Sequence, residues 1–148
     1  MTYTIDMLID KIKEVGKSYD LDKIQAAYEL AEKAHDGVFR SSGEPYITHP
    51  VAVAYILVEQ FCMDTDTICA ALLHDVVEDT DVGLDVIQKK FGEDVAHLVD
   101  GVTKIGQVPL NIREEQQAEN IRKILIAMSK DIRVIIIKLA DRLHNMRT

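Results

Sequence analysis

An apolar run, Ala70-Ala71-Leu72-Leu73, leads directly into His74-Asp75-Val76-Val77-Glu78-Asp79-Thr80. If this segment is helical, His74 and Glu78 lie one turn apart on one face, and Asp75 and Asp79 lie one turn apart beside them. The apolar run belongs in a core, so one histidine and three carboxylates are crowded at the edge of that core. Crowded anions repel one another and are costly to desolvate. The segment therefore indicates a cation among them, most simply a metal ion.

The composition is that of a single globular domain. The chain has 148 residues, of which 47% are hydrophobic, and its formal net charge is −8. This charge argues against nucleic acid as the main partner, and no apolar stretch approaches the roughly 20 residues of a membrane span. Cys62 and Cys69 fit neither a disulfide framework nor a metal knuckle, and both are expected to be small buried residues. With no charged-then-apolar leader at Met1, we expect a reduced, cytoplasmic protein.

Apolar residues at helical spacing predict an all-α chain with one domain over residues 1–148. The stretch 37–50 contains two glycines and two prolines and is expected to be a structured loop. The expected helices run over 4–17, from Asp20 to a stop at Gly37, from Pro50, from about Asp66 into the opening motif, over 84–91, over 94–104, from Arg113 through Met128, and over 131–148.

Three histidines outside the opening motif have different interpretations. Pro50 suits the first position of a helix and restricts the residue before it, so His49 lies at a rigid junction. His49 could hold a metal ion or serve as the N-cap, and the residues alone leave these roles equal. His35 lies in the last turn of its helix, where a histidine favours the helix dipole. His97 has charged neighbours and is interpreted as a surface or interface residue.

The segment 131–148 is hydrophobic all round in its first half, apart from Arg133 and Lys138. A β-branched run also fits a strand, but helical spacing continues to Met146, so a buried helix is preferred. Asp141 falls inside this apolar frame, and a buried carboxylate needs a partner. It either forms a salt bridge to Lys138 or Arg142, or serves as a fourth metal ligand.

Five ordered blocks cover most of the chain, at residues 40–50, 73–80, 91–94, 99–104 and 138–148. Within them, His49, His74-Asp75 and Asp141 form a spaced H…HD…D pattern. The pattern resembles the HD metal-dependent phosphohydrolases. The flanking blocks are closer still to the hydrolase domain of the bacterial RelA/SpoT-type family of bifunctional (p)ppGpp synthetase/hydrolases.

The resemblance implies an all-α HD-domain helical bundle that holds Mn²⁺ through His49, His74, Asp75 and Asp141. Other divalent transition metals would suit the same donors. The implied reaction, part of the stringent response, removes the 3′-pyrophosphate of guanosine 3′,5′-bis(diphosphate) (ppGpp) or its pentaphosphate (pppGpp), giving GDP or GTP and pyrophosphate. The implied roles are placement and deprotonation of water by Glu78 and Asp79, guanine binding by Arg40 and Ser42, and ribose or 5′-phosphate contacts by Asn145 and Thr148.

The residues of the opening motif are intact, which favours a competent hydrolase. The alternatives are another HD-domain nucleotide phosphohydrolase, or a non-catalytic metal-binding regulatory domain of an alarmone synthetase (GTP pyrophosphokinase). Ser41 stands where the family often has lysine, which bears on substrate preference. Because Thr148 falls within an expected helix, we expect a fragment of a longer protein with synthetase and regulatory domains.

Overall fold

The computed structural model describes residues 3–15, 18–106 and 132–147. Within these ranges every regular element is a helix, and the β-pairing is an isolated bridge between Phe39 and Pro45. The helices are α1 (Ile5–Val15), α2 (Leu21–Ala34), α3 (Thr48–Phe61), α4 (Thr65–Asp79), α5 (Leu84–Phe91), α6 (Glu93–Gly106) and α8 (Ile132–Arg147). The predicted all-α class is confirmed. The helix expected from Arg113 through Met128 lies outside the described residues.

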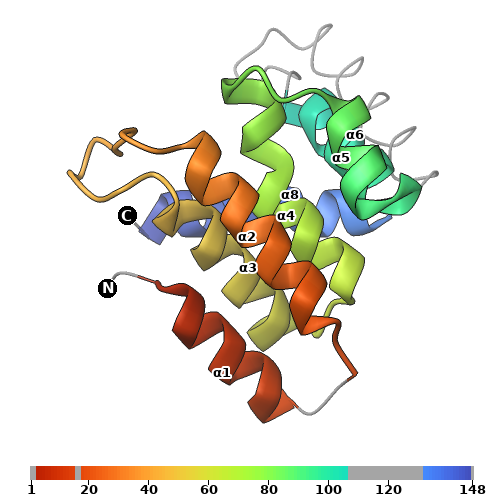
Figure 1. Cartoon of the computed structure of the whole chain (residues 1–148). Coiled ribbons are helices and arrows are strands. Elements are labelled where there is room, and N and C mark those ends of the chain that lie inside the picture. The colour runs from red at the N-terminus through yellow and green to blue at the C-terminus, as the bar shows by residue number, and fades with distance from the viewer. Residues whose placement is uncertain (1–2, 16–17, 107–131, 148) are drawn as a thin grey trace, which may run out of the picture.

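Helix α4 lies in the middle of the bundle, where it packs against α2, α3 and α6 and touches α8 (Figure 1). It begins after Asp64, whose carboxylate accepts a hydrogen bond from the backbone N–H of Thr67 at 3.3 Å, as an N-cap does. From Thr67 to Val76 every residue is buried. Helices that are apolar all round belong inside a bundle, so the run before His74 carries that histidine into the core.

Helix α3 is the second strongly buried element, and it packs against α1, α4 and α8. Leu57 on α3 and Leu72 on α4 are fully buried. Burial of each such side chain stabilises the fold by roughly 1.5–3 kcal/mol. The core is therefore built around the two helices that carry His49 and His74.

Helix α3 begins at Thr48, two residues earlier than predicted, and its N-cap position is occupied by Ile47. The N-cap role considered for His49 is therefore wrong, because His49 lies inside the first turn. Pro50 is tolerated there because the first backbone N–H groups of a helix have no partner within it. The backbone N–H and hydroxyl of Thr48 both donate to the Pro45 carbonyl oxygen, which leads the loop into the helix.

The loop between α2 and α3 is ordered by its own backbone, as expected. The N–H of Arg40 donates to the Glu44 carbonyl at 2.8 Å, and the N–H of Gly43 donates to the Arg40 carbonyl at 2.9 Å. Gly43 has a φ of 91°, which favours glycine. This tight turn fixes the backbone position from which the Arg40 side chain extends.

Helix α8 packs against α3 and α6 with Val134, Ile137 and Ala140 buried, so the strand alternative for this segment is excluded. Its approach to α6 occurs at Gly101. A Cβ atom added there would lie 2.7 Å from Val134 Cγ2. The missing side chain lets α8 come close enough to present Asp141 to the other helices.

The two cysteines have different environments, and both are free thiols. Cys69 on α4 is buried, as predicted. The prediction for Cys62 is wrong, because this residue is exposed and caps α3 with a left-handed backbone (φ 49°) where the chain leaves the core. No helix among the described residues is long and apolar enough to cross a membrane.

Candidate metal and phosphate site

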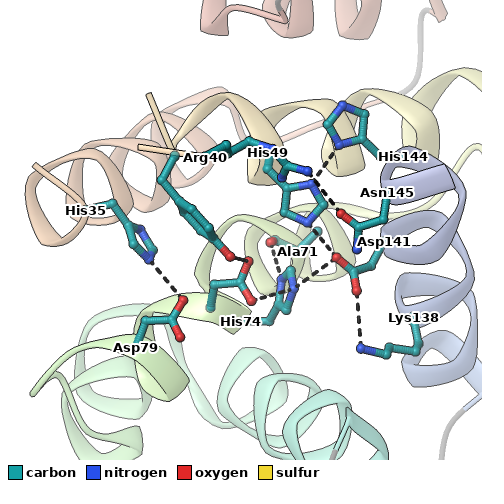
Figure 2. Close-up of polar contacts among 12 residues, drawn as sticks. His35, Arg40, His49, Ala71, His74, Asp79, Lys138, Asp141, His144 and Asn145 are labelled. Carbon is teal, nitrogen blue, oxygen red and sulfur yellow. Dashed lines mark hydrogen bonds and ion pairs between the residues drawn. The ribbon is translucent and has the colours of Figure 1, made fainter. Parts of the chain in front are cut away.

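Four side chains from three helices meet in the core, and we call them the donor cluster: His49 on α3, His74 and Asp75 on α4, and Asp141 on α8. Their exposed fractions are 3%, 2%, 7% and 6%, respectively. The Oδ1 atom of Asp141 lies 2.6 Å from His49 Nε2 and 3.8 Å from His74 Nε2. His74 Nε2 in turn lies 3.1 Å from Asp75 Oδ1. In Figure 2 the labelled rings of His49 and His74 both face the Asp141 carboxylate.

The charges of the donor cluster are mutually stabilised. Burial alone would lower the pKa of His74, but Asp75 and Asp141 outweigh it and raise this pKa well above its ordinary value. Burial alone would raise the pKa of Asp75, yet His74 and a hydrogen bond from Tyr46 bring it to about 2. Against the effect of burial, both histidines hold the pKa of Asp141 well below its usual range. Each of these groups thus favours the charged form of its partners, and a positive charge on His74 offsets part of the charge of the two carboxylates.

The ring orientation of each histidine is fixed by its second nitrogen. His74 Nδ1 donates to the Ala71 carbonyl oxygen at 2.7 Å, which directs Nε2 toward the carboxylates. His49 Nδ1 lies 2.7 Å from His144 Nδ1, so one ring donates and the other accepts. Burial and the neighbouring His49 and Arg40 lower the pKa of His144 to about 4, which leaves that ring neutral.

Three residues support the donor cluster, and two of them, Tyr46 and His144, were not recognised as part of the site from sequence. Tyr46 donates its hydroxyl to Asp75 Oδ2 at 2.9 Å, and His144 bonds His49 as described. Lys138 Nζ lies 3.2 Å from Asp141 Oδ2, so the salt bridge considered for Asp141 exists alongside its contacts with the histidines (Figure 2). Only Lys138 had a sequence signal, because it precedes Asp141 by three residues on the same helix.

Glu78 and Asp79 lie one turn beyond the donor cluster, on the last turn of α4, and both are exposed. Burial of part of the Glu78 side chain and the charge of Asp75 raise its pKa above the ordinary value. Repulsion from Asp79 also raises this pKa and contributes less than these two causes. The Asp79 carboxylate lies 3.8 Å from His35 Nε2, on the side of the cluster away from Lys138 (Figure 2).

His35 and His97 agree with their interpretations from sequence. His35 is the C-cap residue of α2 and its Nδ1 donates to the Ala31 carbonyl oxygen at 3.1 Å. Its ring is buried, and the contact with Asp79 adds a feature that the sequence did not predict. His97 is exposed.

A cavity of about 390 Å³ opens over the donor cluster. At its rim, Arg40 Nη2 donates to the Asn145 side-chain oxygen at 3.2 Å, which joins the loop to α8. Ser42 is exposed and does not line this cavity, whereas Ser41 does; Thr148 lies outside the described residues. The lining residues are Phe39, Arg40, Ser41, Tyr46, His49, Asp75, Asp141 and Asn145.

In the described parts of the chain, no group of three or more His, Cys, Asp or Glu side chains is arranged as a metal site as it stands. The donor cluster instead forms direct contacts of 2.6, 3.1 and 3.8 Å. Ligands held at 2.0–2.2 Å from one ion lie about 3 Å from each other, which is close to these separations. Two imidazoles and two carboxylates without a thiolate suit a divalent transition metal. The residues fit an ion that takes the place of the His74 proton.

Comparison with known proteins identifies the family of the chain. The family model described as HD domain matches residues 27–148. The chain belongs to the HD domain family. A solved structure titled "A metazoan ortholog of SpoT hydrolyzes ppGpp and plays a role in starvation responses" is similar with a TM-score of 0.68 and 33% identity, over 88% of this chain and 72% of that one.

Curated relatives place this HD domain beside the RelA/SpoT-type proteins, so the resemblance is confirmed. It is 52% identical, over 95% of its length, to a guanosine-3′,5′-bis(diphosphate) 3′-pyrophosphohydrolase of Vibrio cholerae. It is 56% identical, over 86% of its length, to a GTP pyrophosphokinase of Streptomyces coelicolor. The chain spans only 20% and 15% of the lengths of these two relatives, respectively.

Proposed function

We propose that this HD domain hydrolyses the 3′-pyrophosphate of ppGpp and of pppGpp, releasing pyrophosphate with GDP or GTP. The observation that carries the proposal is the donor cluster at the floor of a cavity with Arg40 and Asn145 at its rim. A polyphosphate nucleotide needs both an anchor for its base end and positive charge at the scissile phosphate. The 52% identity to a protein named for this reaction supports the same substrate.

We assign His49, His74, Asp75 and Asp141 as the residues that hold Mn²⁺ or a similar divalent ion. Such an ion, when bound, stabilises charge on a phosphoryl oxygen and makes water more acidic. Burial keeps the donors dry, and the hydrogen bonds to Ala71 and His144 keep the imidazole nitrogens aimed inward. These supports are of the kind that orient metal ligands in proteins.

We assign the proton transfer to Glu78 and Asp79. Water attacks the phosphorus bonded to O3′, the O3′–P bond breaks, and the departing 3′-oxygen gains a proton. A raised pKa makes Glu78 the better acceptor for the proton that water loses, because a base works best when its pKa lies near the working pH. Asp79, held beside His35, would orient the water.

We assign guanine binding to Arg40 and Ser42, and contacts with the ribose or the 5′ phosphates to Asn145 and Thr148. The positions of Arg40 and Asn145 at the cavity support their assignments, whereas those of Ser42 and Thr148 rest on the family resemblance. Ser41 lines the cavity and brings no charge there.

Free thiols at Cys62 and Cys69 agree with a reducing cytoplasm. The longer relatives support synthetase and regulatory domains in the complete protein.

A second function is favoured by the match to a GTP pyrophosphokinase, in which this domain would bind metal and regulate a synthetase without catalysis. Incubation of the Mn²⁺-loaded protein with ppGpp, GTP and a cyclic dinucleotide separates these alternatives. We expect consumption of ppGpp alone, with GDP and pyrophosphate formed in equal amounts. Consumption of GTP or the cyclic dinucleotide would indicate another HD phosphohydrolase, and no turnover with metal bound would favour the regulatory role.

A further inference from the structure

We propose that Tyr46 is a positioning residue for the metal site, and that its hydroxyl fixes which oxygen of Asp75 faces the other donors. The inference rests on the proposed function, because it takes Asp75 as a metal ligand. Nothing in the motif pattern marks this tyrosine. Its role comes from a contact between the loop and α4.

The two oxygens of the Asp75 carboxylate have different partners. Oδ2 accepts the Tyr46 hydroxyl hydrogen bond at 2.9 Å, and Oδ1 lies 3.1 Å from His74 Nε2. A buried carboxylate with one oxygen held in this way cannot turn freely about its Cβ–Cγ bond. Tyr46 therefore leaves Oδ1 as the oxygen that faces His74.

Tyr46 is itself held from several sides. Its backbone N–H donates to the Val38 carbonyl oxygen at 2.9 Å. Its ring packs at a tilt of 31° against the buried ring of His35, with a centroid separation of 4.6 Å, and meets His49 edge-on at 6.1 Å. His35 is anchored to the end of α2, so the position of the Tyr46 hydroxyl is set by α2, the loop and α3 together.

The hydroxyl and the ring have separable effects. A phenylalanine would keep the packing against His35 but leave Asp75 Oδ2 without this donor, and a buried acceptor that loses its partner is costly. Residues that orient metal ligands from behind typically change metal affinity 10–100-fold when altered. If Tyr46 only filled space, Tyr46→Phe would leave the metal affinity unchanged, because phenylalanine keeps the ring.

The test is the affinity of the EDTA-treated 148-residue chain for Mn²⁺, measured by isothermal titration calorimetry for wild type, Tyr46→Phe and Tyr28→Phe. Tyr28 is the matched control because its hydroxyl also donates to a carboxylate, that of Glu32, on α2. We expect Tyr46→Phe to raise the Mn²⁺ Kd about 10-fold and Tyr28→Phe to leave it unchanged. Equal Kd values for wild type and Tyr46→Phe would overturn the inference, whereas a wild type that binds no Mn²⁺ would overturn the metal assignment beneath it.

A second variant guards against a folding defect in Tyr46→Phe. His35→Ala removes the ring beneath Tyr46 and no atom that touches Asp75, so it should weaken Mn²⁺ binding less than Tyr46→Phe does. Circular dichroism melts report the fold of each variant. If His35→Ala bound Mn²⁺ more weakly than Tyr46→Phe did, packing around Tyr46 and not its hydroxyl would determine the Mn²⁺ affinity. That result would contradict the proposal.

Discussion

One short stretch of α4 carries two pairs of residues that differ in burial. The first pair is His74 and Asp75 of the donor cluster, and the second is Glu78 and Asp79. His74 and Asp75 are buried and are held by Ala71 and Tyr46. Glu78 and Asp79 are exposed one turn later. A single helix that runs from the core to the surface can thus bind an ion through its buried residues and accept a proton from water through the exposed residues at its end. Because the two pairs differ in burial, mutations should separate metal binding from proton transfer.

The largest effect is expected from Asp141→Ala, which removes the oxygen that both histidines approach. We predict loss of bound metal in elemental analysis and a fall in ppGpp turnover on the order of 10³-fold or more, because water would no longer be activated by an ion. Asp94→Ala changes an exposed carboxylate on α6 and is the control. Full metal occupancy in Asp141→Ala would return Asp141 to a salt-bridge role with Lys138.

The exposed pair is tested by the double variant Glu78→Gln, Asp79→Asn. Metal content should match wild type, since neither side chain belongs to the donor cluster. Turnover should fall about 10²–10⁴-fold, the usual contribution of a general base. The single variants distinguish the two residues, and Glu78→Gln should account for most of the loss. Unchanged pyrophosphate release from the double variant would remove both residues from the chemistry.

A third prediction concerns how α8 is seated. Gly101→Ala places a Cβ 2.7 Å from Val134 Cγ2, so we expect the free energy of unfolding to fall by about 1–3 kcal/mol. Urea denaturation followed by circular dichroism measures it. The combined variant Gly101→Ala, Val134→Ala relieves this clash, so it should cost less than the sum of the two single changes. Additive losses would show that α6 and α8 do not depend on this contact.

The smallest effect is expected at the rim of the cavity. Arg40→Ala should raise the KM for ppGpp about 10-fold with little change in kcat, because one stacking or charged contact to the nucleotide contributes on the order of 1–3 kcal/mol. Lys90→Ala, an exposed cation on α5, is the control for net charge. A fall in kcat at unchanged KM would place Arg40 in the chemical step and not in binding.

Sequence patterns predicted the parts of the structure that depend on neighbours along a helix. The apolar period of α4 and the polar residues that follow it were sufficient to expect a buried His-Asp pair at the end of a core helix. The HD pattern then added His49 and Asp141 from distant segments. Spacing within a helix fixes which side chains share a face, so it bears on His74 and Asp75 alone. His49 and Asp141 came from the family resemblance, and the ligand role of all four remains a prediction.

The remaining contacts could not be predicted because they join segments far apart in sequence. Tyr46 and Asp75 are separated by 29 positions, and His49 and His144 by 95. Similarly, the helical stripe placed Asp79 beside Asp75 but could not show that α2 brings His35 to it. The environment of Cys62 was missed because a helix that is apolar on most sides still has an exposed end.

Anomalous X-ray scattering at the manganese edge from Mn²⁺-soaked crystals shows whether the donor cluster binds a single divalent ion. We predict one strong peak within bonding distance of His49 Nε2, His74 Nε2, Asp75 Oδ1 and Asp141 Oδ1, with the direct His–Asp contacts opened around it. A peak elsewhere, or no peak while His49 and Asp141 remain hydrogen-bonded to each other, would contradict it.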